Sequence, residues 1–260
     1  MPAMDYRKVA SVYDTYVRTE FDVPFFIEEA RAGESVLELT SGTGRLSIPL
    51  IEAGVRLTCL DSSKEMLSVL RQKLAAKGLE APVYQMDMCT FDLSERFDLI
   101  IIPFNSFSEI AEPESQLMAL QAIRLHLLDG GRFICTLHNP PVRLKLVDGQ
   151  SHERGKFPLP DGRWLTLASV ERYDLARQLI EGEQCYEINS EDGKARESWN
   201  MDIRFCLHSK ESFEKLAVEA GFRILRLYGD YQRAAFDPEK SPFMIWEMGC
   251  GIGKKIERIS

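Results

Sequence analysis

A glycine-containing turn, placed between a short apolar segment and a later acid, could carry chemistry in this chain. Residues 36–44 read Val-Leu-Glu-Leu-Thr-Ser-Gly-Thr-Gly. Glycine adopts positive φ without steric cost, so such a turn lets the backbone approach a ligand closely. The next apolar segment, 55–60, ends at Asp61, where nucleotide-binding α/β folds place an acid that binds a ribose hydroxyl. The pattern therefore predicts a nucleoside-cofactor site.

Two common nucleotide motifs do not fit this turn. The dinucleotide fingerprint needs a third glycine, and Ser47 stands at that position. Glu38, just before the turn, would repel a pyrophosphate, whereas it suits a ligand that carries a cation. A P-loop would need Gly-Lys-Ser/Thr at the end of the turn, which does not occur. A nicotinamide oxidoreductase on a Rossmann sheet is therefore a disfavoured alternative.

An acid at Glu38 that faces a cation fits another family. Residues 36–44 resemble motif I of the class I S-adenosylmethionine-dependent methyltransferases, usually written E/D-x-G-x-G-x-G. Thr40 stands at the first glycine of that motif, and Gly42 and Gly44 supply the other two. The resemblance implies that Glu38 reads the ammonium side of the methionine moiety. It also implies that the cofactor is S-adenosylmethionine.

Later strand ends extend the resemblance. Residues 62–65, Ser-Ser-Lys-Glu, predict a capping box at the start of a helix. A third strand, 83–86, ends at Asp87-Met88, and the resemblance implies that this pair holds the adenine. A fourth strand, 97–102, is followed by Phe104, a candidate wall around the sulfonium. The predicted cofactor contacts are Tyr13, Glu38, Thr40, Gly42, Gly44, Asp61, Ser62, Met66, Asp87, Met88 and Phe104.

The acceptor side is predicted from residues near the same sheet edge. The predicted substrate contacts are Asn105, Ser106, Trp164 and Tyr231. His138 ends the fifth strand, 132–138, and imidazole has an ordinary pKa of about 6.5, so it could take a proton from the acceptor. We predict His138 as the general base. The alternative is a histidine that only caps the turn into residues 139–141.

The order of elements predicts an α/β fold: a Rossmann-like seven-stranded sheet of order 3-2-1-4-5-7-6, with an inserted antiparallel sheet as a lid after strand 5. A single methyltransferase domain spans 1–260, with N-terminal helices within 1–32, at 6–17 and 24–31. The inserted sheet occupies about 150–208. Its expected strands are 164–170, 178–180, 184–188 and 199–205. Its expected turns are Asp161-Gly162 and Asp192-Gly193.

The composition limits the classes of partner that we expect for this chain. The net charge is −8 and no basic cluster occurs, which disfavours nucleic acid as a partner. Six cysteines without C-x-x-C pairing suit a reducing cytoplasm, and four scattered histidines give no metal signature. No segment is long and apolar enough for a membrane span. A homodimer through the inserted sheet is an option.

The sequence therefore predicts a small-molecule methyltransferase that acts by direct in-line transfer, at nitrogen rather than oxygen. The alternative is a methyltransferase fold with weak or no turnover that serves as a cofactor-binding or interaction protein.

Overall fold

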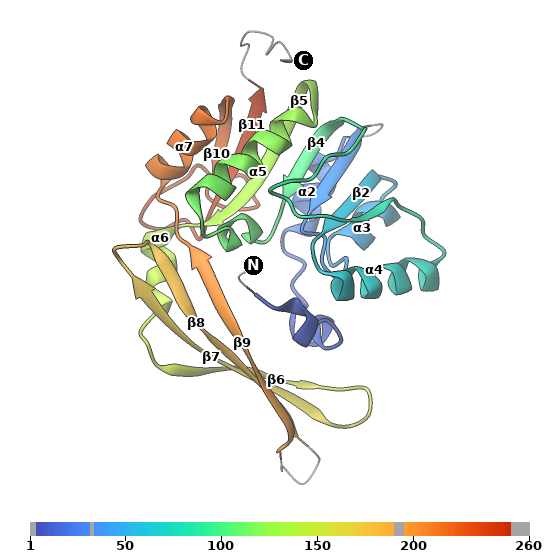
Figure 1. The fold of residues 1–260 in the computed structure, drawn as a ribbon, viewed down its shortest axis with the longest axis vertical. Helices are drawn as coiled ribbons and strands as arrows, with labels where there is room; N and C mark the ends of the chain where they lie inside the picture. The colour runs from blue at the N-terminus through green and yellow to red at the C-terminus, as the bar shows by residue number, and fades with distance from the viewer. Residues whose placement is uncertain (1–3, 32–33, 190–194, 251–260) are drawn as a thin grey trace.

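The computed structural model describes residues 4–31, 34–189 and 195–250. Its larger sheet has seven strands in the order β3-β2-β1-β4-β5-β11-β10, with helices on both faces (Figure 1). β11 runs antiparallel to both of its neighbours, β5 and β10, and the remaining strand pairs are parallel. The strands are β1 (Ser35–Leu39), β2 (Arg56–Asp61), β3 (Val83–Gln85), β4 (Phe97–Ile102), β5 (Leu127–His138), β10 (Phe222–Tyr228) and β11 (Phe243–Cys250). The predicted strand order is confirmed.

The helices around this sheet bury its two faces. They are α2 (Val23–Glu29), α3 (Ser47–Glu52), α4 (Lys64–Lys77), α5 (Pro113–Leu125) and α7 (Lys210–Glu219). Helix α4 begins one residue later than predicted, because the Ser63 side chain, not that of Ser62, caps it by accepting the Met66 N–H. Gly78 ends it with φ 64°, as a left-handed C-cap does. In the ranges that the structure describes, no helix is both long and apolar enough to cross a bilayer.

The N-terminal segment is mostly irregular. The predicted helix over 6–17 is wrong, because the chain forms only η1 (Tyr6–Lys8) and α1 (Tyr13–Tyr16), joined by turns. Val9 and Val12 are buried in a cluster with apolar side chains of the inserted sheet. This tertiary packing overrides the helical periodicity. In Figure 1 the segment lies between the two sheets, where it can cover the carboxyl edge of the larger one.

The smaller sheet is the predicted insertion and extends as a long twisted ribbon (Figure 1). Its strands, in spatial order, are β6 (Ser151–Pro158), β7 (Trp164–Asp174), β8 (Leu179–Asn189) and β9 (Ala195–Cys206). The strands predicted at 178–180 and 184–188 are one strand, β8. β6 was not predicted as a strand, because it is a mostly exposed edge strand without a buried apolar face. The Asp192-Gly193 turn lies outside the described residues. Shorter helices are η2 (Ser106–Glu109), α6 (Pro140–Arg143) and η3 (Leu144–Leu146).

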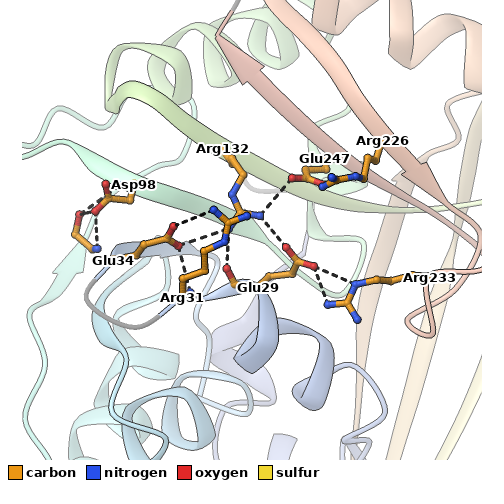
Figure 2. Close-up of polar contacts among 9 residues, drawn as sticks. Glu29, Arg31, Glu34, Asp98, Arg132, Arg226, Arg233 and Glu247 are labelled. Carbon is orange, nitrogen blue, oxygen red and sulfur yellow. Dashed lines mark hydrogen bonds and ion pairs between the residues drawn. The ribbon is translucent and has the colours of Figure 1, made fainter.

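Arg132 in β5 joins helix α2 to the larger sheet (Figure 2). Its guanidinium donates to the Glu29 carboxylate at 2.7 Å and to the Glu247 carboxylate at 3.3 Å. Arg226 donates to Glu247 at 2.8 Å, and Arg233 donates to Glu29 at 2.8 Å. The side chains of Arg132 and Glu247 are only 9% and 3% exposed. The network therefore fixes the end of the N-terminal segment against β5 and β11.

Candidate active site

Two adjoining cavities lie at the carboxyl ends of β1, β2 and β3, with volumes of about 450 Å³ and about 40 Å³. Both cavities are lined by Tyr13, Thr40, Gly42 and Ser106. The larger is also lined by Asp61, Ser62, Met66, Asp87 and Met88. Glu38 and Phe104 line the smaller. The structure therefore brings together every predicted cofactor contact except Gly44.

Asp61 is fixed at the larger cavity by two backbone groups. The N–H groups of Gly42 and Ser63 donate to different oxygens of its carboxylate, both at 2.8 Å. Burial raises the pKa of Asp61, while these backbone hydrogen bonds lower it. The carboxylate thus links the glycine turn to the start of α4, and its remaining lone pairs can accept hydrogen bonds from ligand hydroxyls.

Glu38 is buried at the smaller cavity, and the Ser47 hydroxyl donates to it at 2.6 Å. Burial raises the pKa of Glu38 to about 8, because a charged carboxylate loses its hydration there. A ligand cation would favour its ionised form. Ser47, noted in the sequence only as the residue that breaks the dinucleotide fingerprint, is therefore the partner that orients this acid.

Two non-glycine residues that line the smaller cavity have strained backbones. Thr40 and Phe104 have φ values of 62° and 58°, and positive φ is uncommon for threonine and phenylalanine. The Arg45 guanidinium lies 4.6 Å from the centre of the Phe104 ring. Asn105, a predicted substrate contact, follows Phe104 but lines neither cavity, and its Oδ1 is buried without a hydrogen-bond partner among the described residues. Strained residues and orphaned acceptors are typical of ligand sites.

Gly44 has a packing role, and its predicted contact with the cofactor stays a prediction. It is not among the residues that line the two cavities. Its φ is 85°, and a Cβ at this position would overlap Leu70 Cδ1 on α4. The third glycine of the motif therefore lets the turn approach α4.

Gly44→Ala is expected to lower the free energy of unfolding more than Gly54→Ala does. Both glycines have positive φ, 85° and 83°, but a Cβ on Gly54 meets no atom within 4 Å. The left-handed backbone costs about 1–2 kcal/mol for either alanine, and overlap with Leu70 adds about 1–3 kcal/mol for Gly44 alone. Urea denaturation measures the difference. Equal losses in the two variants would contradict the packing role.

Two aspartates anchor the N-terminal segment to the glycine turn. Asp14 accepts hydrogen bonds from the Thr43 hydroxyl at 2.6 Å and from the Lys73 ammonium at 2.9 Å. Asp22 accepts two from Arg45, each at 2.6 Å. The Asp22 side chain is fully buried. Tyr13, next to the first anchor, lines both cavities, so the two anchors hold this part of the chain beside the site. These contacts could not be predicted from the sequence because they join residues far apart in the chain.

Tyr6 and Glu109 form a further contact at the larger cavity, which both residues line. The Tyr6 hydroxyl donates to the Glu109 carboxyl at 2.8 Å, and burial raises the pKa of Glu109 to about 8. The sequence analysis named neither residue. The one signal that could have found Glu109 is its place shortly after Ser106, on the loop that follows β4.

The structure does not bring His138 to the cavities. Its ring stacks on that of Phe243 with centres 6.2 Å apart, and it is not among the residues that line either cavity. Burial and the charge of Arg143 lower the pKa of His138 to about 4. Its role as general base stays a prediction, and the structural alternative agrees with this placement.

The low pKa of His138 predicts that its contribution to stability depends on pH. At His138 the folded state binds fewer protons than the unfolded state between pH 6.5 and pH 4, so the contribution of this residue to the free energy of unfolding should fall as the pH falls through this window. The loss should reach about 3 kcal/mol for a shift of this size. The buried acids Glu38 and Glu109, whose pKa values are raised to about 8, contribute with the opposite sign. Urea titrations of the wild type and of His138→Gln should therefore differ in slope across this window, with the wild type losing more stability or gaining less on acidification, and equal slopes would contradict the assignment.

Trp164 and Tyr231, predicted to contact the substrate, lie elsewhere. Trp164 is 44% exposed at the start of β7, and Tyr231 is buried. The Tyr231 ring packs on Phe25 and Phe243, and its hydroxyl donates to Thr136 Oγ1 at 3.3 Å. Neither residue lines a cavity. An aromatic pattern alone cannot show which face of a sheet a side chain occupies.

The arrangement fits a nucleoside that carries a cation. Asp61 can hold a ribose, Asp87 can accept from a base amine, and Glu38 can face an ammonium group. The shared lining residues join these positions into one site. No group of three or more His, Cys, Asp or Glu side chains placed to hold a metal ion occurs in the part of the chain that the structure describes.

Comparison with known proteins agrees with this geometry. Residues 36–131 match a family described as a methyltransferase domain. The cypemycin N-terminal methyltransferase of Streptomyces sp. is 35% identical over 140 residues, which cover 53% of this chain and 55% of that enzyme, about half its length. The glycine/sarcosine N-methyltransferase of Aphanothece halophytica is 25% identical over 227 residues, which cover 84% of this chain and 77% of that enzyme.

A solved structure shares the fold over nearly the whole chain. It is that of an S-adenosylmethionine-dependent methyltransferase from Clostridium acetobutylicum ATCC 824, with a TM-score of 0.80 at 19% identity, covering 95% of this chain and 99% of that one. The matched segment contains the glycine turn, Asp61 and Asp87, and Gly42, Asp61 and Asp87 line the larger cavity. The chain therefore shares the fold of this methyltransferase, and its residues 36–131 match the methyltransferase domain family.

Proposed function

We propose that the protein transfers a methyl group from S-adenosylmethionine to the nitrogen of a small-molecule amine. The observation that carries the proposal is the pair of cavities that share Tyr13, Thr40, Gly42 and Ser106, with Glu38 at one and Asp61 at the other. The bound cofactor supplies an activated methyl group on a sulfonium. The protein then has to position the nucleophile and exclude water.

Each part of the site has a task in this reaction. Asp61 and the Gly42 backbone orient the ribose, while Glu38, held by Ser47, faces the ammonium of the methionine moiety. Tyr13 lies where the two cavities meet, and the edges of its ring and its oxygen suit a positive charge. The N-terminal segment, anchored at Asp14 and Asp22, covers the site and excludes water.

Nitrogen is favoured because an amine needs only to be neutral to attack, whereas a hydroxyl needs a strong base, and His138 lies away from the cavities. The two named relatives are an N-terminal methyltransferase and a glycine/sarcosine N-methyltransferase. We further propose a single domain with the inserted sheet as its lid, a possible homodimer, and no nucleic-acid partner, given the net charge of −8. Six free cysteines support a cytoplasmic location.

Methyl transfer to a panel of acceptors tests the proposal. The protein is incubated with isotope-labelled S-adenosylmethionine and glycine, sarcosine or a short peptide with a free N-terminus, each paired with its hydroxy analogue. Mass spectrometry should find the label on the nitrogen of at least one amine and on no hydroxy analogue. Asp61→Ala is the inactive control. Transfer to hydroxyl groups alone, or no formation of S-adenosylhomocysteine with any acceptor, would contradict the proposal.

A further inference from the structure

Glu109 is a carboxyl group at the wall of the larger cavity that the protein leaves without a cation. Its Oε1 accepts the Tyr6 hydroxyl at 2.8 Å. Among the described residues, no lysine, arginine or histidine forms an ion pair with it. Desolvation and the charge of Asp61 act on it in the same direction, both raising its pKa. This half-buried carboxyl therefore holds a proton near neutral pH when no ligand is present, and a cationic ligand beside it would stabilise its ionised form.

The surroundings of Glu109 suit a cationic ligand. The rings of Tyr6 and Tyr13, which line the same cavity, meet edge to face with centres 6.2 Å apart. Aromatic rings beside a carboxylate favour an ammonium group. Arg204 also lines the cavity, but it lies 3.6 Å from Glu112, so its charge is already opposed there.

Resting on the proposed function, we infer that Glu109 binds the protonated amine of the acceptor and takes its proton, and that Tyr6 positions it. In this step one N–H bond of the ammonium breaks and an O–H bond forms at Glu109 Oε2. The electron pair of the broken bond stays on nitrogen as the lone pair that attacks. The Tyr6 hydroxyl continues to donate to Oε1, which leaves Oε2 for the acceptor. The proton later passes to water.

The acid strength of Glu109 suits this role. Burial raises its pKa to about 8 in the site without an acceptor, and a base is most effective when its pKa lies near the working pH. A bound ammonium would favour the carboxylate and so lower this pKa. The other titratable groups that line the cavity are Tyr6, Tyr13, Asp61, Asp87, Cys89, Glu112 and Arg204.

A titration that needs no knowledge of the acceptor tests the inference. The protein carries ¹³C-carboxyl glutamate, is saturated with S-adenosylhomocysteine, and is titrated by NMR with isopropylammonium chloride as the probe. Isopropanol and potassium chloride at equal ionic strength are the controls, and Glu109→Gln assigns the signal. The pKa of Glu109 should fall by about one unit or more with the amine alone. The same shift with all three additives, or no shift with any, would overturn the inference.

Calorimetry separates the acceptor from the sulfonium as the cation at Glu109. Glu109→Gln should bind S-adenosylmethionine and S-adenosylhomocysteine as the wild type does, as should Glu112→Gln, a control at an exposed position of the same cavity. A selective loss of S-adenosylmethionine affinity in Glu109→Gln would place the sulfonium at Glu109 and overturn the inference.

Tyr6→Phe isolates the positioning role. The hydroxyl that stabilises the carboxylate is lost, so the pKa of Glu109 should rise further while cofactor affinity is retained, and an unchanged pKa would remove Tyr6 from the inference. The proposed function is tested independently of the role of Glu109. If isopropylammonium lowers the pKa of Glu109 but the acceptor panel yields no N-methylated product, Glu109 binds a cation and the proposed N-methylation is contradicted.

Discussion

Asp61→Ala is expected to lower the affinity for S-adenosylhomocysteine tenfold or more while the fold survives. The carboxylate accepts the N–H groups of Gly42 and Ser63, both at 2.8 Å, and lines the larger cavity. Alanine removes the acceptor for the ribose hydroxyls and leaves the turn unsupported. A hydrogen bond to a charged group contributes about 1.5–3 kcal/mol, and about 1.4 kcal/mol corresponds to a factor of ten in affinity. Isothermal calorimetry measures the change.

Asp98→Ala is the matched control for this variant. Asp98 is also a sheet-end acid that accepts from a backbone N–H, that of Ser35 at 2.8 Å. It lies near the start of β4, at the opposite edge from the cavities, so its loss should leave cofactor affinity unchanged. Circular dichroism of both variants separates binding from folding. Wild-type affinity in a folded Asp61→Ala protein would remove Asp61 from the site.

Arg132→Met is expected to lower the free energy of unfolding by about 3–5 kcal/mol, the usual cost of removing one partner from a buried ion pair. The substitution leaves the carboxylates of Glu29 and Glu247 without the guanidinium that lies between them (Figure 2). Arg226 and Arg233 remain, but each reaches only one of the two acids. Urea denaturation followed by tryptophan fluorescence measures the loss.

Arg226→Met is the control within the same network. Arg226 contacts the same Glu247 at 2.8 Å, but its side chain is 58% exposed, so its ion pair is screened by water. Its loss should destabilise the fold far less than the loss of Arg132. Similar losses in the two variants would show that Arg132 does not hold the network together.

Much of the fold could be predicted because the larger sheet obeys local rules. β4, with the sequence Phe-Asp-Leu-Ile-Ile-Ile, is apolar enough to be recognised as a central strand, and its predicted bounds, 97–102, are those observed. The predicted N-terminal helix over 6–17 is wrong because Val9 and Val12 pack on a sheet whose first strand begins only at Ser151. Periodicity within a segment carries no information about such a partner.

Most of the predicted cofactor contacts line the cavities because they lie at or near strand ends, where chain position determines spatial position. Glu38, Asp61 and Asp87 are of this kind. The acceptor side depends on which way a side chain points from a loop or an inserted sheet. Trp164 and His138 line neither cavity, so their predicted roles stay predictions, and Glu109, on the loop after β4, could not be predicted.

Calorimetry of the wild-type protein with S-adenosylhomocysteine and with NAD tests the central claim most directly. The geometry of Glu38, the glycine turn and Asp61 predicts one site per chain for S-adenosylhomocysteine and no measurable heat of binding for NAD. Binding of NAD with no binding of S-adenosylhomocysteine would contradict the assignment of these cavities to the methyl-donor cofactor.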